Sequence, residues 1–102
     1  MQKYILAVTW EHDIESVAYE FDTWEEACKY MRAMWKWCIE CEYEECDGKE
    51  NSLLNEDQTN CDMEQGTAVM TWNSNYMDEL DHRYWEVIPK SEPLKLPERF
   101  YE

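Results

Sequence analysis

The chain has 102 residues, of which 24 are acidic and nine are basic, so its formal net charge is −15. This length fits one domain and is too short for two, and a protein this acidic is repelled by nucleic acid and by anionic membranes. No stretch approaches the roughly 18 apolar residues of a membrane span. Residues 1–3 lead directly into a strand-like run without a small-residue cleavage site, so we expect a cytoplasmic protein without a signal peptide.

The first part of the chain predicts a hairpin followed by a helix. Residues 4–10 are β-branched and aromatic, and residues 17–21 alternate apolar and polar side chains, as strands do. Thr23 followed by Glu26 is a capping box, which predicts a helix from about Thr23 to about Cys41. Spacings of three and four give this helix one apolar stripe, made by Trp24, Ala27, Cys28, Met31, Met34, Trp35 and Cys38.

Residues 42–66 differ in composition from the rest. They contain nine acidic residues and one basic residue, hence a net charge of −8, and few apolar side chains. We expect a long acidic loop here, with no more than one helical turn near residues 52–54. A loop of this length inside a compact domain is usually functional or mobile.

The last part of the chain predicts two more strands and a tail. Residues 67–72 and 82–88 are strand-like, and Pro89, Pro93 and Pro97 then indicate an extended segment over 89–102. The order β-β-α-insert-β-β predicts an α+β domain over residues 1–88. We expect a small antiparallel sheet of about four strands, with one amphipathic helix packed on one face.

The cysteines raise the question of a metal site. Cys38, Cys41, Cys46 and Cys61 have intervals of two, four and fourteen residues, and four thiolates are able to close a zinc site. In zinc ribbons, however, the Cys-x2-Cys pair lies on a tight turn, whereas here it ends a helix. We therefore expect reduced thiols without a metal or other cofactor, and we keep a structural zinc or a redox-sensitive cysteine cluster as the alternative.

Catalytic patterns are weak in this sequence. His12 and His82 each stand beside a carboxylate, which suits a metal site, but neither belongs to a recognisable ligand spacing. Gly48 and Gly66 stand alone, so there is no glycine-rich phosphate loop, and no serine elbow is present. We expect a protein that is not an enzyme and has no catalytic residues.

The uneven charge is the strongest functional signal. Residues 23–41 and 89–102 are each neutral, so the negative charge gathers in the hairpins and above all in 42–66. Carboxylates at intervals can replace phosphates on a basic groove, and a solvated loop that maintains solubility is the alternative. The predicted partner is a basic protein surface, as on a nucleic-acid-binding protein, and the predicted contact residues are Glu42, Glu44, Glu45, Asp47, Glu50, Glu56 and Asp57.

In size, charge, lack of catalytic motifs and α+β pattern, the chain resembles the small acidic inhibitors made by phages and mobile elements. Anti-CRISPR proteins and other nucleic-acid mimics belong to this class. The resemblance implies a non-enzymatic, anti-defence inhibitor that binds a basic protein surface. It rests on no specific motif, so it assigns no role to any single residue.

Overall fold

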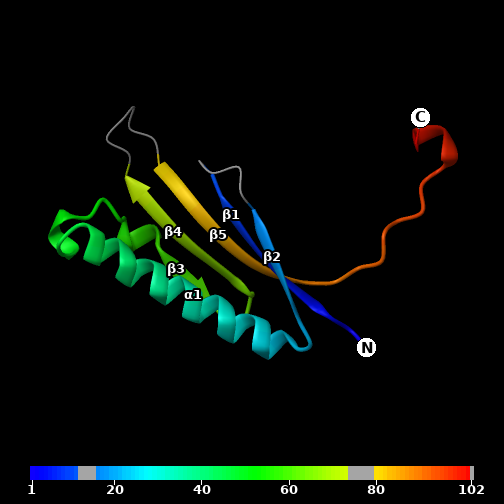
Figure 1. Ribbon diagram of the computed structural model, residues 1–102, viewed down its shortest axis with the longest axis horizontal. Coiled ribbons are helices and arrows are strands. Elements are labelled where there is room, and N and C mark those ends of the chain that lie inside the picture. Colours follow the sequence, from blue (N-terminus) through cyan, green and yellow to red (C-terminus); the bar gives the residue numbers. More distant parts are fainter. Residues whose placement is uncertain (12–15, 74–79, 102) are drawn as a thin grey trace.

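The computed structural model describes residues 1–11, 16–73 and 80–101, and it has an antiparallel sheet with one long helix across it (Figure 1). This confirms the α+β class. The sheet has five strands in the order β2-β1-β5-β4-β3, one more than expected. The strands are β1 (Tyr4–Trp10), β2 (Val17–Phe21), β3 (Asn60–Asp62), β4 (Thr67–Asn73) and β5 (Leu80–Pro89). The helix is α1 (Trp24–Glu45). Three short 3-10 turns are η1 (Lys49–Asn51), η2 (Glu56–Gln58) and η3 (Glu98–Tyr101).

The core lies between α1 and one face of the sheet. Side chains alternate between the faces of a strand, so Leu6 and Val8 of β1 share a face with their partners Val87 and Trp85 of β5. All four are buried. They meet the apolar stripe of α1, in which Ala27, Cys28, Met31 and Cys38 are buried and Trp24, Met34 and Trp35 pack at its margins.

The N-terminus of α1 confirms the predicted cap. Thr23 is extended, and its Oγ1 accepts a hydrogen bond from the backbone N–H of Glu26 at 3.1 Å. This satisfies one of the N–H groups that the first helical turn leaves without a partner. The exposed acidic residues Glu25 and Glu26 also lie where the positive end of the helix dipole stabilises them.

The C-terminus of α1 lies one turn beyond the expected end. The helix continues to Glu45 because glutamate is a good helix former and nothing interrupts it before residue 46. It then closes as a Schellman motif, in which Gly48 N–H donates to Tyr43 O at 2.9 Å and Asp47 N–H donates to Glu44 O at 3.2 Å. Asp47 takes the left-handed conformation, with φ of 57°, that this motif requires.

The expectation of a long acidic loop over 42–66 is wrong. Leu54 forms a bridge with Trp72, β3 pairs along β4, and η1 and η2 fill the intervals. Asn55 caps η2 by accepting from the backbone N–H of Gln58 at 3.2 Å. The sequence of the extra strand, Asn60–Asp62, does not by itself predict a strand. These residues form one because they pair with the edge of β4.

The two ends of β5 differ slightly from expectation. β5 begins two residues early at Leu80 and includes Pro89, which pairs with Tyr4 at the end of the sheet. Beyond Lys90, residues 91–101 are exposed and run away from the body of the molecule (Figure 1). The predicted connections at 12–15 and 74–79 lie outside the described residues. Of the helices that are described, none has the length and hydropathy to cross a membrane.

Candidate functional site

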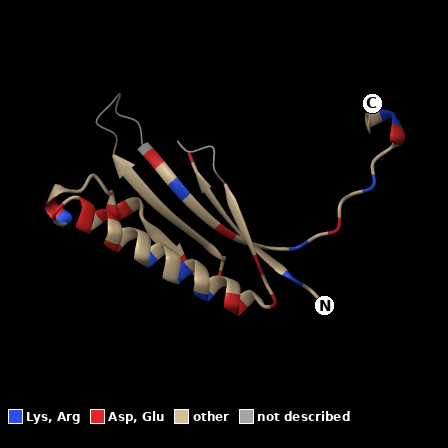
Figure 2. Ribbon diagram, viewed as in Figure 1, with Lys and Arg blue, Asp and Glu red and all other residues tan. Residues whose placement is uncertain are grey.

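Carboxylates gather where α1 ends and the chain turns back towards the sheet (Figure 2). The last turn of α1, the Schellman motif that closes it and the two following 3-10 turns supply five of the seven predicted contact residues, all of them exposed. We call these five the acidic end; they are Glu44, Glu45, Asp47, Glu50 and Asp57. None of the five has an ion pair within the described part of the chain.

The other two predicted contact residues have structural partners instead. Glu42 Oε1 accepts from Ser52 Oγ at 3.1 Å and from Cys46 Sγ at 3.5 Å. Glu56 Oε1 accepts from Tyr43 Oη at 3.0 Å and forms an ion pair with Lys49. These contacts hold the turns after α1 against the helix. Glu42 and Glu56 therefore position the acidic end rather than belong to it.

The charges around Glu56 explain its protonation state. The hydrogen bonds from Lys49 and then from Tyr43 lower the pKa of the Glu56 carboxyl below its usual value. The hydrogen bond and charge of Glu56 raise the pKa of Lys49, and burial followed by the Glu56 contact raises the pKa of Tyr43. Glu56 is therefore ionised at neutral pH, and Lys49 is already paired with it.

A hollow of about 680 Å³ opens beside these residues. Its lining includes Glu50, Glu56 and Asp57, together with Tyr43, Leu54 and Lys49. Because Glu56 neutralises Lys49, two carboxylates remain without a counter-charge. The hollow therefore has the chemistry to receive a lysine or arginine side chain, whose apolar stem would contact Leu54 and Tyr43.

The acidic end acts against the stability of α1. The C-terminus of a helix carries partial negative charge, which favours lysine or arginine in the last turn and disfavours carboxylates. The last turn of α1 contains no basic residue and places Glu44 and Glu45 at this unfavourable position. Each such carboxylate costs about 0.3–1 kcal/mol of helix stability.

The four cysteines of the alternative zinc site are not brought together. Among the described residues, no group of three or more histidine, cysteine, aspartate or glutamate side chains is placed to hold a metal ion. Cys38 is buried on the side of α1 that faces the sheet, where its Sγ accepts from Arg83 at 3.0 Å. Cys46 caps the helix and bonds to Glu42, and Cys61 packs from β3 against the core.

The thiols also lack the environment of reactive cysteines. Burial is the largest cause that raises the pKa of the thiols of Cys28, Cys38, Cys46 and Cys61. Arg83 opposes this effect at Cys38, and Glu42 adds to it at Cys46. A thiol that is held protonated is a poor nucleophile and a poor metal ligand.

We predict that neither a chelator nor a reducing agent changes the melting temperature of the protein. The physical reason is that the free thiols of Cys38 and Cys46 already have protein partners and no disulfide crosslinks the chain. Thermal melts with and without each reagent test this, alongside elemental analysis. Stoichiometric zinc together with unfolding on chelation would restore the zinc alternative.

Of the two histidines, His82 lies in the part of the chain that the structure describes. His12 lies outside the described residues. His82 Nδ1 lies 2.9 Å from Glu11 Oε2, which also accepts from the His82 backbone N–H at 3.1 Å. The His82 ring stacks on Tyr84, with 5.3 Å between ring centroids. This contact joins the ends of two neighbouring strands, which is a structural role.

Two features of the surface had no clear counterpart in the sequence. The Tyr43–Glu56–Lys49 contact depends on how the turns fold, and no local spacing signals it. Trp37 is 63 % exposed on the outer face of α1. Its position off the apolar stripe was the only sign of this exposure.

No family model, curated protein or solved structure matches this chain.

Proposed function

We propose that this protein is a non-enzymatic interaction protein that presents the acidic end to a basic protein surface, and that it acts as an inhibitor by occupying that surface. The observation that carries the proposal is the projection of five exposed carboxylates from one ordered end of the molecule. Opposite charges across an interface accelerate encounter and fix orientation. A groove that normally receives phosphates is the kind of surface that these carboxylates would fit.

The placement of the charge supports recognition over simple solubility. Carboxylates spread evenly would maintain solubility without cost to any helix. Here Glu44 and Glu45 stand at the helix end where they are least favourable, and Asp47 occupies a left-handed position where glycine is the usual residue. Retaining negative charge at a position where it reduces stability is typical of functional sites.

The ordered state of the turns also supports the proposal. Because Glu42 and Glu56 tie residues 49–56 to the helix, little conformational freedom is lost when the acidic end binds. The hollow beside Glu50 and Asp57 would give one basic side chain of the partner a defined position.

We predict that a fourfold neutral variant, with Glu44→Gln, Glu45→Gln, Asp47→Asn and Glu50→Gln, loses basic partners. Its net charge is −11, four units less negative than the −15 of the wild type. Asparagine tolerates the left-handed conformation of residue 47. Affinity capture at low salt, followed by quantification of the bound basic proteins, measures the effect.

The control is a second variant of the same net charge, with Asp22→Asn, Glu25→Gln, Glu26→Gln and Glu64→Gln, none of which lies in the tail. These four residues are exposed and lie away from the acidic end. The control should keep its partners, because position and not total charge decides binding. Equal capture by both variants would contradict the proposal. The acidic-end variant should also melt at the same or a higher temperature, since it removes repulsion at the end of α1.

A further inference from the structure

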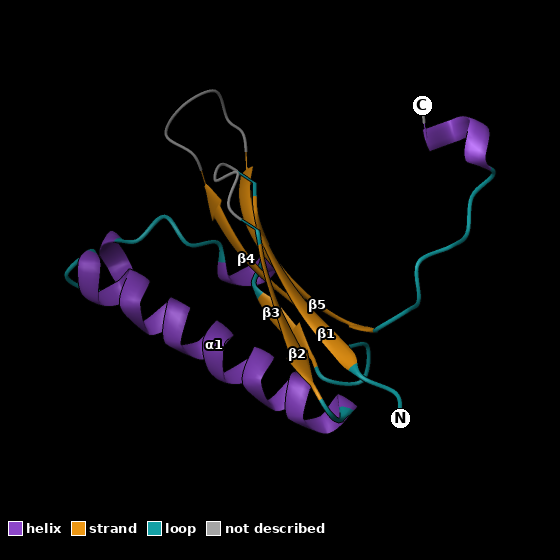
Figure 3. Cartoon of the chain, turned by 45° about the vertical axis from the view of Figure 1, so that its right-hand side comes forward, coloured by secondary structure: helices purple, strands orange, loops and turns teal. Residues whose placement is uncertain are grey.

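The face of the sheet opposite α1 has no covering layer over β1, β2 and β5 among the described residues (Figure 3). Its apolar side chains include Ile5 and Ala7 of β1 and Tyr84 and Ile88 of β5. Tyr84 and Ile88 are each 42 % exposed. The corner at Thr71 is covered, because Thr71 is buried and its Oγ1 donates to Gln58 O in η2 at 2.8 Å. We call Ile5, Ala7, Tyr84 and Ile88 the open face.

The tail carries apolar side chains that are exposed to solvent. Leu94 is 80 % exposed and Phe100 is 63 % exposed, and Leu96 and Tyr101 are exposed as well. Four such side chains in eleven residues make a segment that is more apolar than an ordinary solvated linker. The chain therefore has both an uncovered apolar face and an exposed apolar tail.

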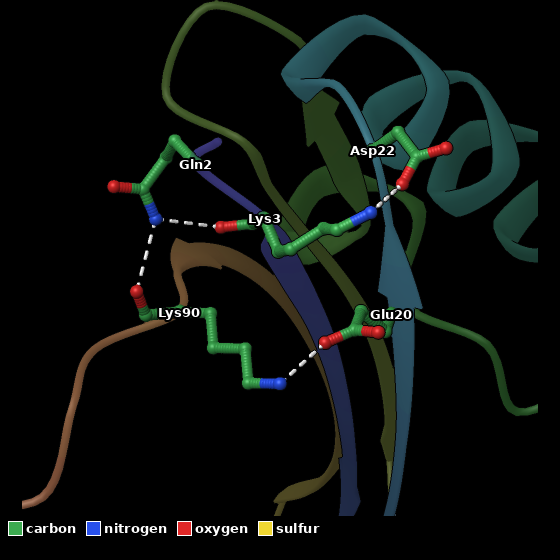
Figure 4. A network of polar contacts seen from close by, with 5 residues as sticks. All are labelled: Gln2, Lys3, Glu20, Asp22 and Lys90. Atoms are coloured by element: carbon green, nitrogen blue, oxygen red, sulfur yellow. Dashed lines mark hydrogen bonds and ion pairs between the residues drawn. The ribbon is translucent and has the colours of Figure 1, made fainter.

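Contacts of Gln2, Lys3 and Glu20 fix the root of the tail at Lys90 (Figure 4). Gln2 Nε2 donates to Lys90 O at 2.9 Å, and Lys90 N–H donates to Lys3 O at 2.8 Å. Lys90 Nζ also lies 2.7 Å from Glu20 Oε1, so this ion pair occupies the end of the open face where the tail begins. The tail then runs outward from the body of the molecule (Figure 1).

We propose that the tail, residues 91–101, covers the open face of a second copy of this chain, and that the two copies exchange tails reciprocally. A twofold dimer makes this contact twice, so both open faces and both tails are covered. The exchange places Leu94, Leu96 and Phe100 of one copy on Ile5, Tyr84 and Ile88 of the other.

The dimensions of the two parts agree. The extended residues 91–97 span roughly 22 Å, and the 3-10 turn η3 adds roughly 8 Å. The ten residues of β5 span about 33 Å, so one tail follows the length of the open face. The prolines of the tail keep it extended and reduce the entropy that it loses on docking.

The tail is also better suited by its charge than the rest of the chain to approach a second, acidic copy of the protein. Lys95 and Arg99 balance Glu92 and Glu98 in residues 91–101, so this segment is neutral in a chain of −15. Glu86 lies on the same side of the sheet as the open face, and it gives a basic residue of the incoming tail a partner. Repulsion between the two bodies remains, and it weakens as salt is added.

Sedimentation velocity of the full chain over a concentration series tests the exchange. The wild type should form a dimer whose dissociation constant falls at high salt, because apolar contacts remain and repulsion is screened. The Leu94→Ser, Phe100→Ser variant and the Tyr84→Ser, Ile88→Ser variant should each weaken the dimer about 100-fold or more, as loss of central apolar contacts does. Trp37→Ser, an exposed apolar residue on the opposite side of the molecule, should leave it unchanged.

Mixing the tail variant with the face variant tests whether the tail of one copy binds the open face of another. A mixed dimer retains one intact contact, so the mixture should associate more tightly than either variant alone. A wild type that stays monomeric up to about 1 mM, or a mixture that never associates, would overturn the proposal. The dimer strengthens with salt while capture by the acidic end weakens with salt, so the failure of one proposal is distinguishable from the failure of the other.

Discussion

Met31→Asp should unfold the domain. Met31 is fully buried at the centre of the α1 stripe, within the same cluster as Leu6, Met70 and Trp85. An aspartate there removes the packing of a long apolar side chain, which costs about 2–5 kcal/mol. It also buries a carboxyl group among apolar side chains, which costs about 2–7 kcal/mol more. A domain of this size has a total stability of about 5–15 kcal/mol. Circular dichroism should show loss of most of the folded signal near room temperature.

Two neighbouring substitutions serve as controls for Met31→Asp. Met31→Leu conserves volume and apolar character, so it should cost less than about 1.5 kcal/mol. Arg32→Ala changes an exposed side chain one residue away and should stay within about 0.5 kcal/mol of the wild type. If Arg32→Ala destabilised the protein more than Met31→Asp, the assignment of the buried helix face would be wrong.

Gly66→Ala should be the second most damaging change. Gly66 lies in the turn between β3 and β4 with φ of +68°, and its carbonyl accepts from Val87 N–H at 2.7 Å. A Cβ built there lies 2.6 Å from Trp24 Cη2 and 3.2 Å from Val87 Cβ. The rigid indole is packed edge-on against Tyr4, with 5.9 Å between ring centroids, so it resists displacement.

The two costs of Gly66→Ala add. Left-handed backbone costs roughly 1–2 kcal/mol for a residue with a Cβ, and an overpacked core costs roughly 1–3 kcal/mol. The melting temperature should fall by at least about 10 °C. Gly48→Ala is the matched comparison, because Gly48 also has a positive φ, of +128°, but its Cβ would meet the flexible Glu50 carboxylate at 3.2 Å instead of a rigid indole. A loss in Gly66→Ala no greater than in Gly48→Ala would contradict the packing described here.

The sequence was informative wherever local periodicity matched the final environment. The three-and-four spacing from Trp24 to Cys38 predicted the buried side of α1, and the alternation around Leu6 predicted a strand that contributes to the core. The capping box at Thr23 located the start of the helix. These signals survive folding because the same apolar side chains that create the pattern are the ones that become buried.

The sequence was uninformative where pairing depends on distant residues. Asn60–Asp62 forms a strand only because β4 offers it an edge, and the bridge from Leu54 to Trp72 has the same origin. The Schellman motif at Asp47 was missed because it places aspartate where glycine is usual. Glu42 and Glu56 resemble their neighbours in sequence, and only the fold shows that their carboxylates have internal partners.

The rate of association with a captured basic protein tests the central claim most directly. Stopped-flow measurements would compare the wild type, the acidic-end variant and the control variant of equal charge. They would be made near 0.01 M salt, where the screening length is about 30 Å, and near 1 M salt, where it is about 3 Å. At low salt the wild type and the control should associate at least about tenfold faster than the acidic-end variant. At high salt the three rates should converge. Equal low-salt rates for the wild type and the acidic-end variant would contradict the role assigned to Glu44, Glu45, Asp47 and Glu50.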